Sequence, residues 1–163
     1  MGRPVKKGLD YFPVDVDIFQ DIKVRKLIKY QGAKAFSVYI YLLSIIYKDG
    51  YYFKWDDFLP FTIAEVTGCV EAYVREVIEC CFKVDLLSRS QYQTNAILTS
   101  RAIQERYVEI NNSMRRNAVV SEYSLVDDIL NRQTNANHST KPDDKRRGVQ
   151  AAPAQPEAYD MPF

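Results

Sequence analysis

Side chains that could act as nucleophiles, general bases or metal ligands are scarce in this 163-residue sequence. The single histidine is His138, and the three cysteines are Cys69, Cys80 and Cys81. A structural zinc site needs about four converging ligands, and these side chains are too few and too badly spaced along the sequence to predict one. The sequence contains no glycine-rich phosphate-binding loop and no histidine within the part expected to fold. We therefore expect a protein that is not an enzyme and that holds no metal or cofactor.

The charged residues are more informative, because they are unevenly distributed. Lys and Arg total 22 and Asp and Glu total 21, which gives a net charge of +1 and no strong overall field. Residues 1–34 carry 8 basic and 4 acidic side chains, whereas residues 35–100 carry 5 and 8. Any affinity for nucleic acid must therefore come from local basic patches.

The first patch is the amino-terminal arm. Gly2-Arg3-Pro4 followed by Lys6 and Lys7 resembles the core of an A·T-hook, in which arginine lies in a narrow minor groove. Arg3, Lys6 and Lys7 are accordingly candidate DNA contacts. A basic arm that only improves solubility is the other interpretation.

The pattern of apolar residues predicts the helices and strands that would position these side chains. Residues 35–47 form an apolar stretch too short to cross a membrane, so we expect a core helix rather than a span. Gly68 separates two further helices, and Ser100 can cap a last one. The expected helices cover residues 23–30, 34–48, 58–67, 70–81 and 100–116, and the expected strands cover residues 51–55, 86–89 and 96–99.

This order of elements predicts a winged helix-turn-helix fold, mainly α with a small β-hairpin (α+β), followed by a long carboxyl-terminal helix and a disordered tail. The recognition helix would present Arg75 to DNA. The hairpin wing would present Arg89 and Tyr92, and an exposed loop without a binding role is the other interpretation of the wing. The outward row Glu71, Arg75, Glu79 and Lys83 alternates in sign, however, so a solvated helix face remains an alternative.

Two features of the long helix and the tail suggest partners. Ile103, Tyr107, Ile110 and Met114 form a narrow seam, which would either close a homo-oligomer or pack on the protein's own core. Residues 124–130 place apolar side chains on one face of a possible short helix, either for docking a partner or for packing on the domain. We expect three regions: a basic arm at 1–14, a winged-helix domain with extra helices at 15–116, and a flexible tail at 117–163.

Three strings carry a resemblance to a known family: GLDYFPVDVDIF near the start, GYYFKWDD at residues 50–57 and ILTSRAIQERY at residues 97–107. They resemble the amino-terminal domain of phage replisome-organiser-type proteins, which is related to the winged-helix domain of the primosomal protein DnaD. The resemblance covers about residues 8–116 and implies DNA binding, self-association and a role in replication initiation. The short polar tail departs from DnaD-like proteins, which carry a second helical domain.

The last residues, Asp160-Met161-Pro162-Phe163, resemble the carboxyl-terminal tip of bacterial single-stranded-DNA-binding proteins. In such a tip the terminal Phe enters an apolar pocket of a replication enzyme, and a basic residue holds its carboxylate. The tip would dock replisome proteins such as a helicase or primase. A chance ending on a disordered tail is the alternative.

The leading hypothesis is a non-enzymatic, DNA-associated replication accessory protein of a phage or mobile element. The alternatives are a winged-helix transcriptional regulator and a protein-interaction adaptor without DNA binding. The cysteine pattern suggests reduced thiols, and the amino terminus does not resemble an export signal, so we expect a cytoplasmic protein without membrane contact.

Overall fold

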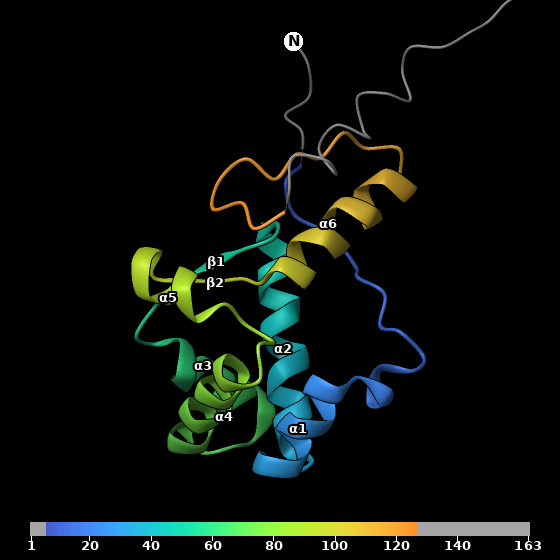
Figure 1. Cartoon of the computed structure of the whole chain (residues 1–163). Coiled ribbons are helices and arrows are strands. Elements are labelled where there is room, and N and C mark those ends of the chain that lie inside the picture. The colour runs from blue at the N-terminus through green and yellow to red at the C-terminus, as the bar shows by residue number, and fades with distance from the viewer. Residues whose placement is uncertain (1–5, 127–163) are drawn as a thin grey trace, which may run out of the picture.

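The computed structural model describes residues 6–126, which form six α-helices, one short 3₁₀ helix and two short strands (Figure 1). Helices at the five predicted positions are confirmed, and the fold is of the predicted α+β class. The elements are η1 (Ile18–Gln20), α1 (Ile22–Gln31), α2 (Lys34–Asp49), β1 (Phe53–Lys54), α3 (Leu59–Thr67), α4 (Glu71–Lys83), α5 (Arg89–Asn95), β2 (Ile97–Leu98) and α6 (Arg101–Ser113).

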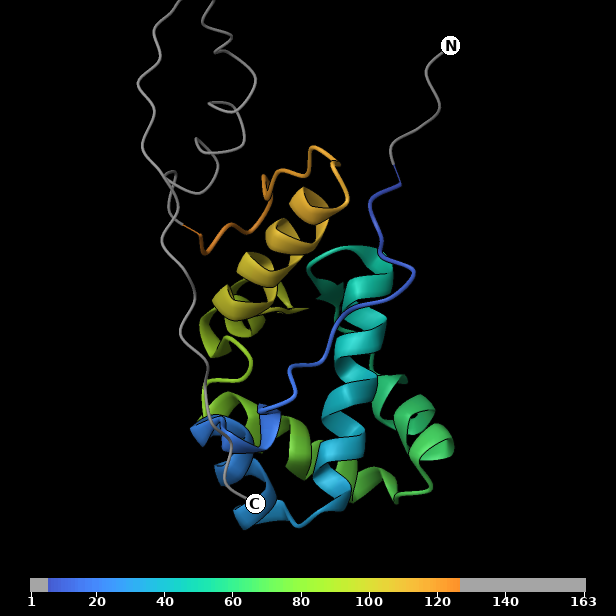
Figure 2. The same ribbon diagram turned by 90° about the vertical axis from the view of Figure 1, so that its right-hand side faces the viewer.

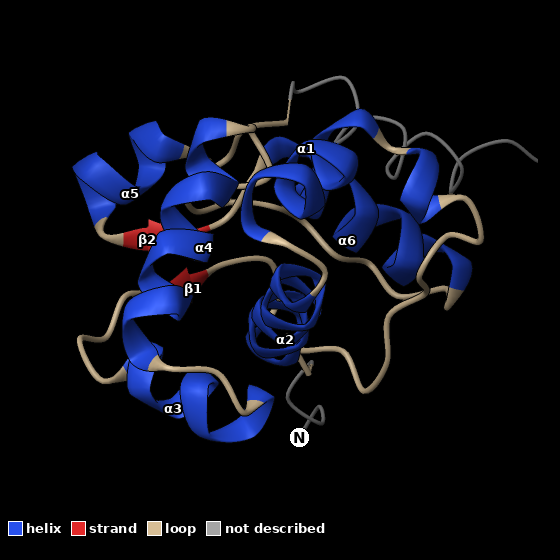
Figure 3. Cartoon of the chain, turned by 90° about the horizontal axis from the view of Figure 1, so that it is seen from below, coloured by secondary structure: helices blue, strands red, loops and turns tan. Residues whose placement is uncertain are grey.

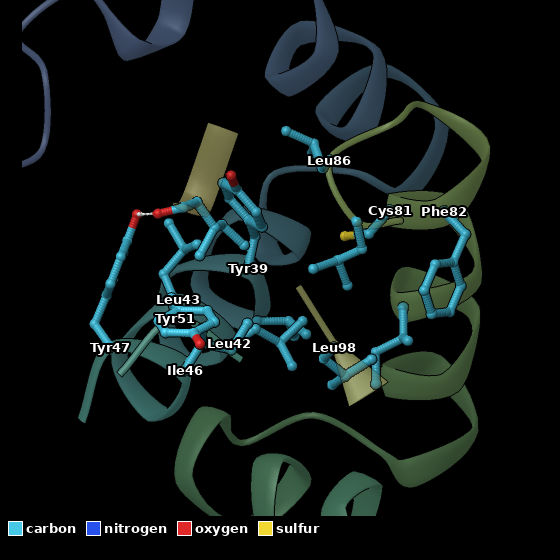
Figure 4. Packing of buried hydrophobic residues seen from close by; sticks show 14 of the residues in the cluster. Tyr39, Leu42, Leu43, Ile46, Tyr47, Tyr51, Cys81, Phe82, Leu86 and Leu98 are labelled. Atoms are coloured by element: carbon cyan, nitrogen blue, oxygen red, sulfur yellow. Dashed lines mark hydrogen bonds between the residues drawn. The ribbon is translucent and has the colours of Figure 1, made fainter. Parts of the chain in front are cut away.

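Helix α2 is the centre of the core, as its nearly continuous apolar sequence predicts. Val38, Leu42 and Ile46 recur every four residues along one face and are all fully buried. Figure 3 looks along α2 and shows the other long helices arranged around it. In Figure 4, Tyr51 and Leu98 pack with side chains of α2. Within residues 6–126, no helix is long and apolar enough to cross a membrane.

Helices α3 and α4 are joined by a tight turn that matches the sequence pattern. Pro60 lies in the first turn of α3, where the missing N–H of proline costs little. Gly68 ends the helix with φ 67°, a left-handed conformation that suits glycine. Of the apolar face expected for residues 70–81, Val74, Val77 and Ile78 are buried, whereas Val70 precedes α4 and is 69% exposed.

The predicted β-hairpin at residues 86–99 is wrong. Strand β2 pairs antiparallel with the distant strand β1, with Phe53 opposite Leu98, while residues 86–89 form no strand. The presumed wing loop is helix α5, whose first turn is capped because Ser88 Oγ accepts a hydrogen bond from Gln91 N at 3.3 Å. A single backbone hydrogen bond, from Ser88 N to Thr99 O (2.8 Å), joins the two segments that were expected to pair.

Helix α6 begins as predicted, with Ser100 Oγ accepting a hydrogen bond from Ile103 N at 3.3 Å. It ends at Ser113 rather than near residue 116. Ile103, Tyr107 and Ile110 of the apolar seam are buried in the protein's own core. Of the two alternatives for this seam, packing within the chain is therefore the one observed.

The segments before α1 and after α6 also contribute to the core. Leu9 is buried, and its N–H donates to Tyr47 O at 2.8 Å. Val120 and Val126 are buried beyond the end of α6. Figure 2 shows the amino-terminal segment passing along α2. It also shows the chain after α6 folding back beside α6. Residues 124–126 are not helical, whereas 127–130 and the tip residues Asp160, Met161, Pro162 and Phe163 lie outside the described residues.

Candidate nucleic-acid interface

The exposed face of α4 is occupied largely by ion pairs. Arg75 Nη2 lies 2.7 Å from Glu71 Oε1, one helical turn earlier. Arg89 Nη2, on α5, lies 2.5 Å from Glu79 Oε1 of α4. A major-groove reader normally offers unpaired donors to the bases, whereas both arginines here donate to carboxylates. This geometry matches the solvated, charge-balanced face that the sequence pattern left open.

Tyr92 of α5 belongs to an aromatic cluster. Its ring centroid lies 5.3 Å from that of Trp55, nearly perpendicular at 81°, and 4.9 Å from that of Phe82. The Arg89 guanidinium lies over the same Phe82 ring at 5.4 Å. Tyr92 therefore attaches α5 to β1 and α4, and stacking on a nucleic-acid base would require the ring to leave this cluster.

The described basic residues of the amino-terminal arm also form ion pairs within the protein. Lys6 pairs with Asp10. Lys7 Nζ lies 3.6 Å from Glu122 Oε2, donates to the Tyr52 hydroxyl at 3.4 Å and lies 4.6 Å from the Tyr52 ring centroid. Partial burial acts to lower the pKa of Lys7, but its contacts with Tyr52 and Glu122 outweigh that effect and raise the pKa overall. Arg3 lies outside the described residues.

Helix α1 is basic as well, although none of its residues was among the predicted DNA contacts. This helix carries four basic residues and no acidic one, so its composition alone could have identified it. Arg25, Lys26 and Lys29 are exposed, and none of them forms an ion pair within residues 6–126. The fourth, Lys23, donates to Asp85 O at 3.0 Å.

A shallow groove of about 480 Å³ separates the end of α1 from α4 and α5. Lys83 Nζ of α4 lies 5.3 Å from the ring centroid of Tyr30, which is 57% exposed on α1. Glu76 and Glu79 also line the groove, together with Arg75 and Arg89. The structure thus brings Arg75 and Arg89 together, whereas Figure 1 shows the amino-terminal arm near the other end of α2.

The side chains within residues 6–126 form no cluster of the kind that holds a metal ion. No group of three or more His, Cys, Asp or Glu side chains is placed there to hold a metal ion. Cys80 and Cys81 are free and buried, and burial raises the pKa of both thiols. The described surface can therefore offer charged contacts and apolar contacts, but no activated thiol at these two positions.

Comparison with known proteins gives one family and one curated relative. The family profile described as "Lin1244/Lin1753-like, N-terminal" matches residues 11–103. The "Uncharacterized phage-related protein Lin1244/Lin1753" of Listeria innocua serovar 6a is 35% identical over 127 residues, covering 78% of this chain and 42% of that protein. The chain thus spans less than half the length of this relative. No solved structure significantly matches the present chain.

Proposed function

The chain belongs to the Lin1244/Lin1753-like family, and on that basis we propose that it is a non-enzymatic, DNA-associated accessory protein of a phage, acting in the initiation of replication. The phage-related name of the Listeria protein supports the phage or mobile-element origin. The replication role is supported by the resemblance of residues 8–116 to replisome-organiser-type proteins.

The observation that carries the proposal is the pair of helices α3 and α4. They are joined through the tight turn at Gly68 and packed against α2, and this packing supports a helix-turn-helix interpretation of the pair. The β1–β2 pair lies beside them, and one backbone hydrogen bond, from Ser88 N to Thr99 O, joins the start of α5 to the segment after β2. We interpret this as a winged helix-turn-helix in which α5 replaces the wing.

Self-association and docking of a helicase or primase through the tip at residues 160–163 are further parts of this proposal. The free, buried thiols of Cys80 and Cys81 suit a reducing cytoplasm. No described contact supplies the loader activity of DnaD-like proteins, so we do not assign it.

A protein-interaction adaptor is the second candidate, and one observation favours it. Phe58, which precedes α3, and Phe61 in the first turn of α3 are 75% and 50% exposed, and exposed aromatic side chains of this size are typical of protein contacts. The ion pairs on α4 also favour an adaptor, because they leave that helix few free groups for contacting bases.

Fluorescence anisotropy of labelled duplex and single-stranded DNA, titrated with the full chain at about 50 and 200 mM salt, separates the two candidates. We expect binding that weakens steeply as salt rises, because phosphate contacts release counterions. Absence of binding to both DNA forms at the lower salt concentration would contradict DNA association and leave the adaptor.

A further inference from the structure

We propose that the phosphate backbone of DNA lies along the exposed face of α1 and extends to Lys83 of α4. This inference rests on the proposed function, because it names the surface through which the protein would hold DNA. We call the set of Arg25, Lys26, Lys29 and Lys83 the α1 basic surface.

The basic residues differ in whether they already have a carboxylate partner. Arg75, Arg89, Lys6 and Lys7 each have a carboxylate partner, so a phosphate would have to displace that partner. Arg25, Lys26 and Lys29 have no such partner among residues 6–126, and α1 contains no acidic residue. Cations of this kind can contact phosphate and release its counterions without breaking an internal pair.

The second argument is the geometry of the helix. Val24 and Leu27 fix the buried side of α1, and the basic residues occupy the opposite side. From Arg25 to Lys29 the helix rises about 6 Å, at 1.5 Å per residue. Each strand of a DNA duplex advances about 3.4 Å along the duplex axis per phosphate, and neighbouring phosphates lie farther apart than this rise because the strand winds around the axis. The length from Arg25 to Lys29 is therefore comparable to about one gap between adjacent phosphates. Adjacent phosphates can therefore meet successive basic side chains of one rigid helix.

The third argument is the continuity between α1 and α4. Lys23 Nζ donates to Asp85 O just beyond α4, which fixes the end of that helix against α1. Lys83 lies over the Tyr30 ring, so its ammonium continues the row of charges across the junction. Tyr30, which is exposed, adds a hydroxyl donor of the kind that contacts phosphate oxygens.

The acidic residues nearby define the limit of the surface. Glu76 and Glu79 line the groove beyond Tyr30, and Glu79 holds the Arg89 guanidinium there, whereas Arg25, Lys26 and Lys29 lie outside the groove lining. A surface of exposed lysine and arginine side chains contacts phosphates rather than base edges. We therefore expect this surface to bind DNA without sequence preference.

The test compares two triple variants that remove the same charge. In the first, Arg25→Gln, Lys26→Gln and Lys29→Gln neutralise α1; glutamine keeps the helix propensity. In the control, Lys48→Gln, Lys54→Gln and Arg115→Gln neutralise three exposed basic residues elsewhere, also without an ion pair within residues 6–126. Circular dichroism and thermal unfolding establish that both variants are folded.

The readout is anisotropy with the DNA form that the wild type binds, measured over a series of salt concentrations. For the α1 variant we expect the slope of log affinity against log salt to fall by about 2 to 3, because each lost phosphate contact removes about 0.7 to 0.9. Its affinity at low salt should fall roughly tenfold or more. A smaller contribution, a slope change of about 1, is expected for Lys83→Gln alone.

The outcomes distinguish failure of the α1 basic surface from failure of the proposed DNA association. Wild-type binding that the α1 variant retains to the same extent as the control variant would overturn this inference and leave the proposed function standing. Failure of the wild type to bind either DNA form would overturn the proposed function and this inference with it. A selective loss in the α1 variant supports both.

Discussion

Lys7 and Glu122 meet across the end of α2, with 3.6 Å between Lys7 Nζ and Glu122 Oε2. Tyr52 joins the same cluster, because its hydroxyl donates to Glu122 Oε2 at 2.6 Å and its ring lies beneath the lysine ammonium. The Glu122 N–H donates in turn to the Tyr51 hydroxyl at 3.1 Å. These contacts fasten the segments before α1 and after α6 to one another and to the core.

The first prediction concerns the pH dependence of this cluster. The hydrogen bond from Tyr52 and, after it, the charge of Lys7 hold the pKa of Glu122 below its ordinary value of 4.5. A lowered folded-state pKa means that the stabilisation is present above pH 4.5 and is lost as pH falls through the folded-state value. We expect Glu122→Gln to lower the urea midpoint at pH 7 and to have a smaller effect near pH 3.

The control for this prediction is Glu65→Gln, which changes an exposed carboxylate that has no ion pair within residues 6–126. Its urea midpoint should follow that of the wild type at both pH values. A Glu122→Gln effect of equal size at pH 7 and pH 3 would contradict the assigned role of the carboxylate charge.

The second prediction concerns Gln104, which is fully buried on α6. Its Nε2 donates to Tyr123 O at 2.9 Å, and its Oε1 accepts from Leu125 N at 2.6 Å. Gln104→Leu removes the partner of both backbone groups, so we expect a loss of about 2 to 6 kcal/mol in the free energy of unfolding, at about 1 to 3 per unpaired group. Urea denaturation measures this loss.

Limited proteolysis gives a second readout for Gln104→Leu, because release of residues 118–126 would expose that segment to cleavage. The matched control is Gln93→Leu on the exposed side of α5, which should change stability by no more than about 0.5 kcal/mol. Equal stability of the two variants would show that Gln104 does not hold the segment.

The helices were predictable because their sequences carry strong local signals. α2 is apolar nearly throughout, and α4 repeats its buried residues every three or four positions. Helix α5 has no such signal: its sequence RSQYQTN is polar, and the packing of Tyr92 between Trp55 and Phe82 helps to order it. The partner of β2 was equally hidden, since pairing with β1 joins residues 45 positions apart, from Phe53 to Leu98.

In the candidate site, too, local sequence features were predictable, whereas contacts between distant segments were not. The charge of α1 can be read from ten consecutive residues. The pairing of Arg89 with Glu79, by contrast, depends on how α5 packs beside α4, and the contact of Lys7 with Glu122 depends on the path of two chain segments. Sequence alone therefore favoured Arg89 and Lys7 as DNA contacts, although the structure gives each a carboxylate partner.

The third prediction concerns the reactivity of the cysteines. Cys81 is fully buried and Cys80 is nearly so, and burial raises the pKa of both thiols. Cys69 is half-buried at the turn between α3 and α4. Because thiolates are the reactive species, we expect a disulfide reagent to modify one thiol of the native protein and all three after unfolding in urea. Cys69→Ser should abolish the native reaction, and rapid modification of that variant would contradict the prediction.

The fourth prediction compares two glycines that are required for different reasons. Gly68 has a left-handed backbone (φ +67°) but open space around it, so Gly68→Ala should cost only the conformational penalty, about 1 kcal/mol. At Gly8 an added Cβ would lie 1.8 Å from Lys48 O, the backbone of α2. Relief requires the amino-terminal segment to move away, which exposes Leu9 and breaks its hydrogen bond to Tyr47 O.

We therefore expect Gly8→Ala to destabilise the protein by about 2 to 4 kcal/mol, from the burial of one leucine and one backbone hydrogen bond. Parallel urea titrations of the two variants measure the difference. If Gly8→Ala proved no more destabilising than Gly68→Ala, the amino-terminal segment would contribute little to stability, and Lys7 would be free to leave Glu122 for a phosphate. The glycine comparison thus also bears on whether the amino-terminal arm or the α1 basic surface is the better candidate for holding DNA.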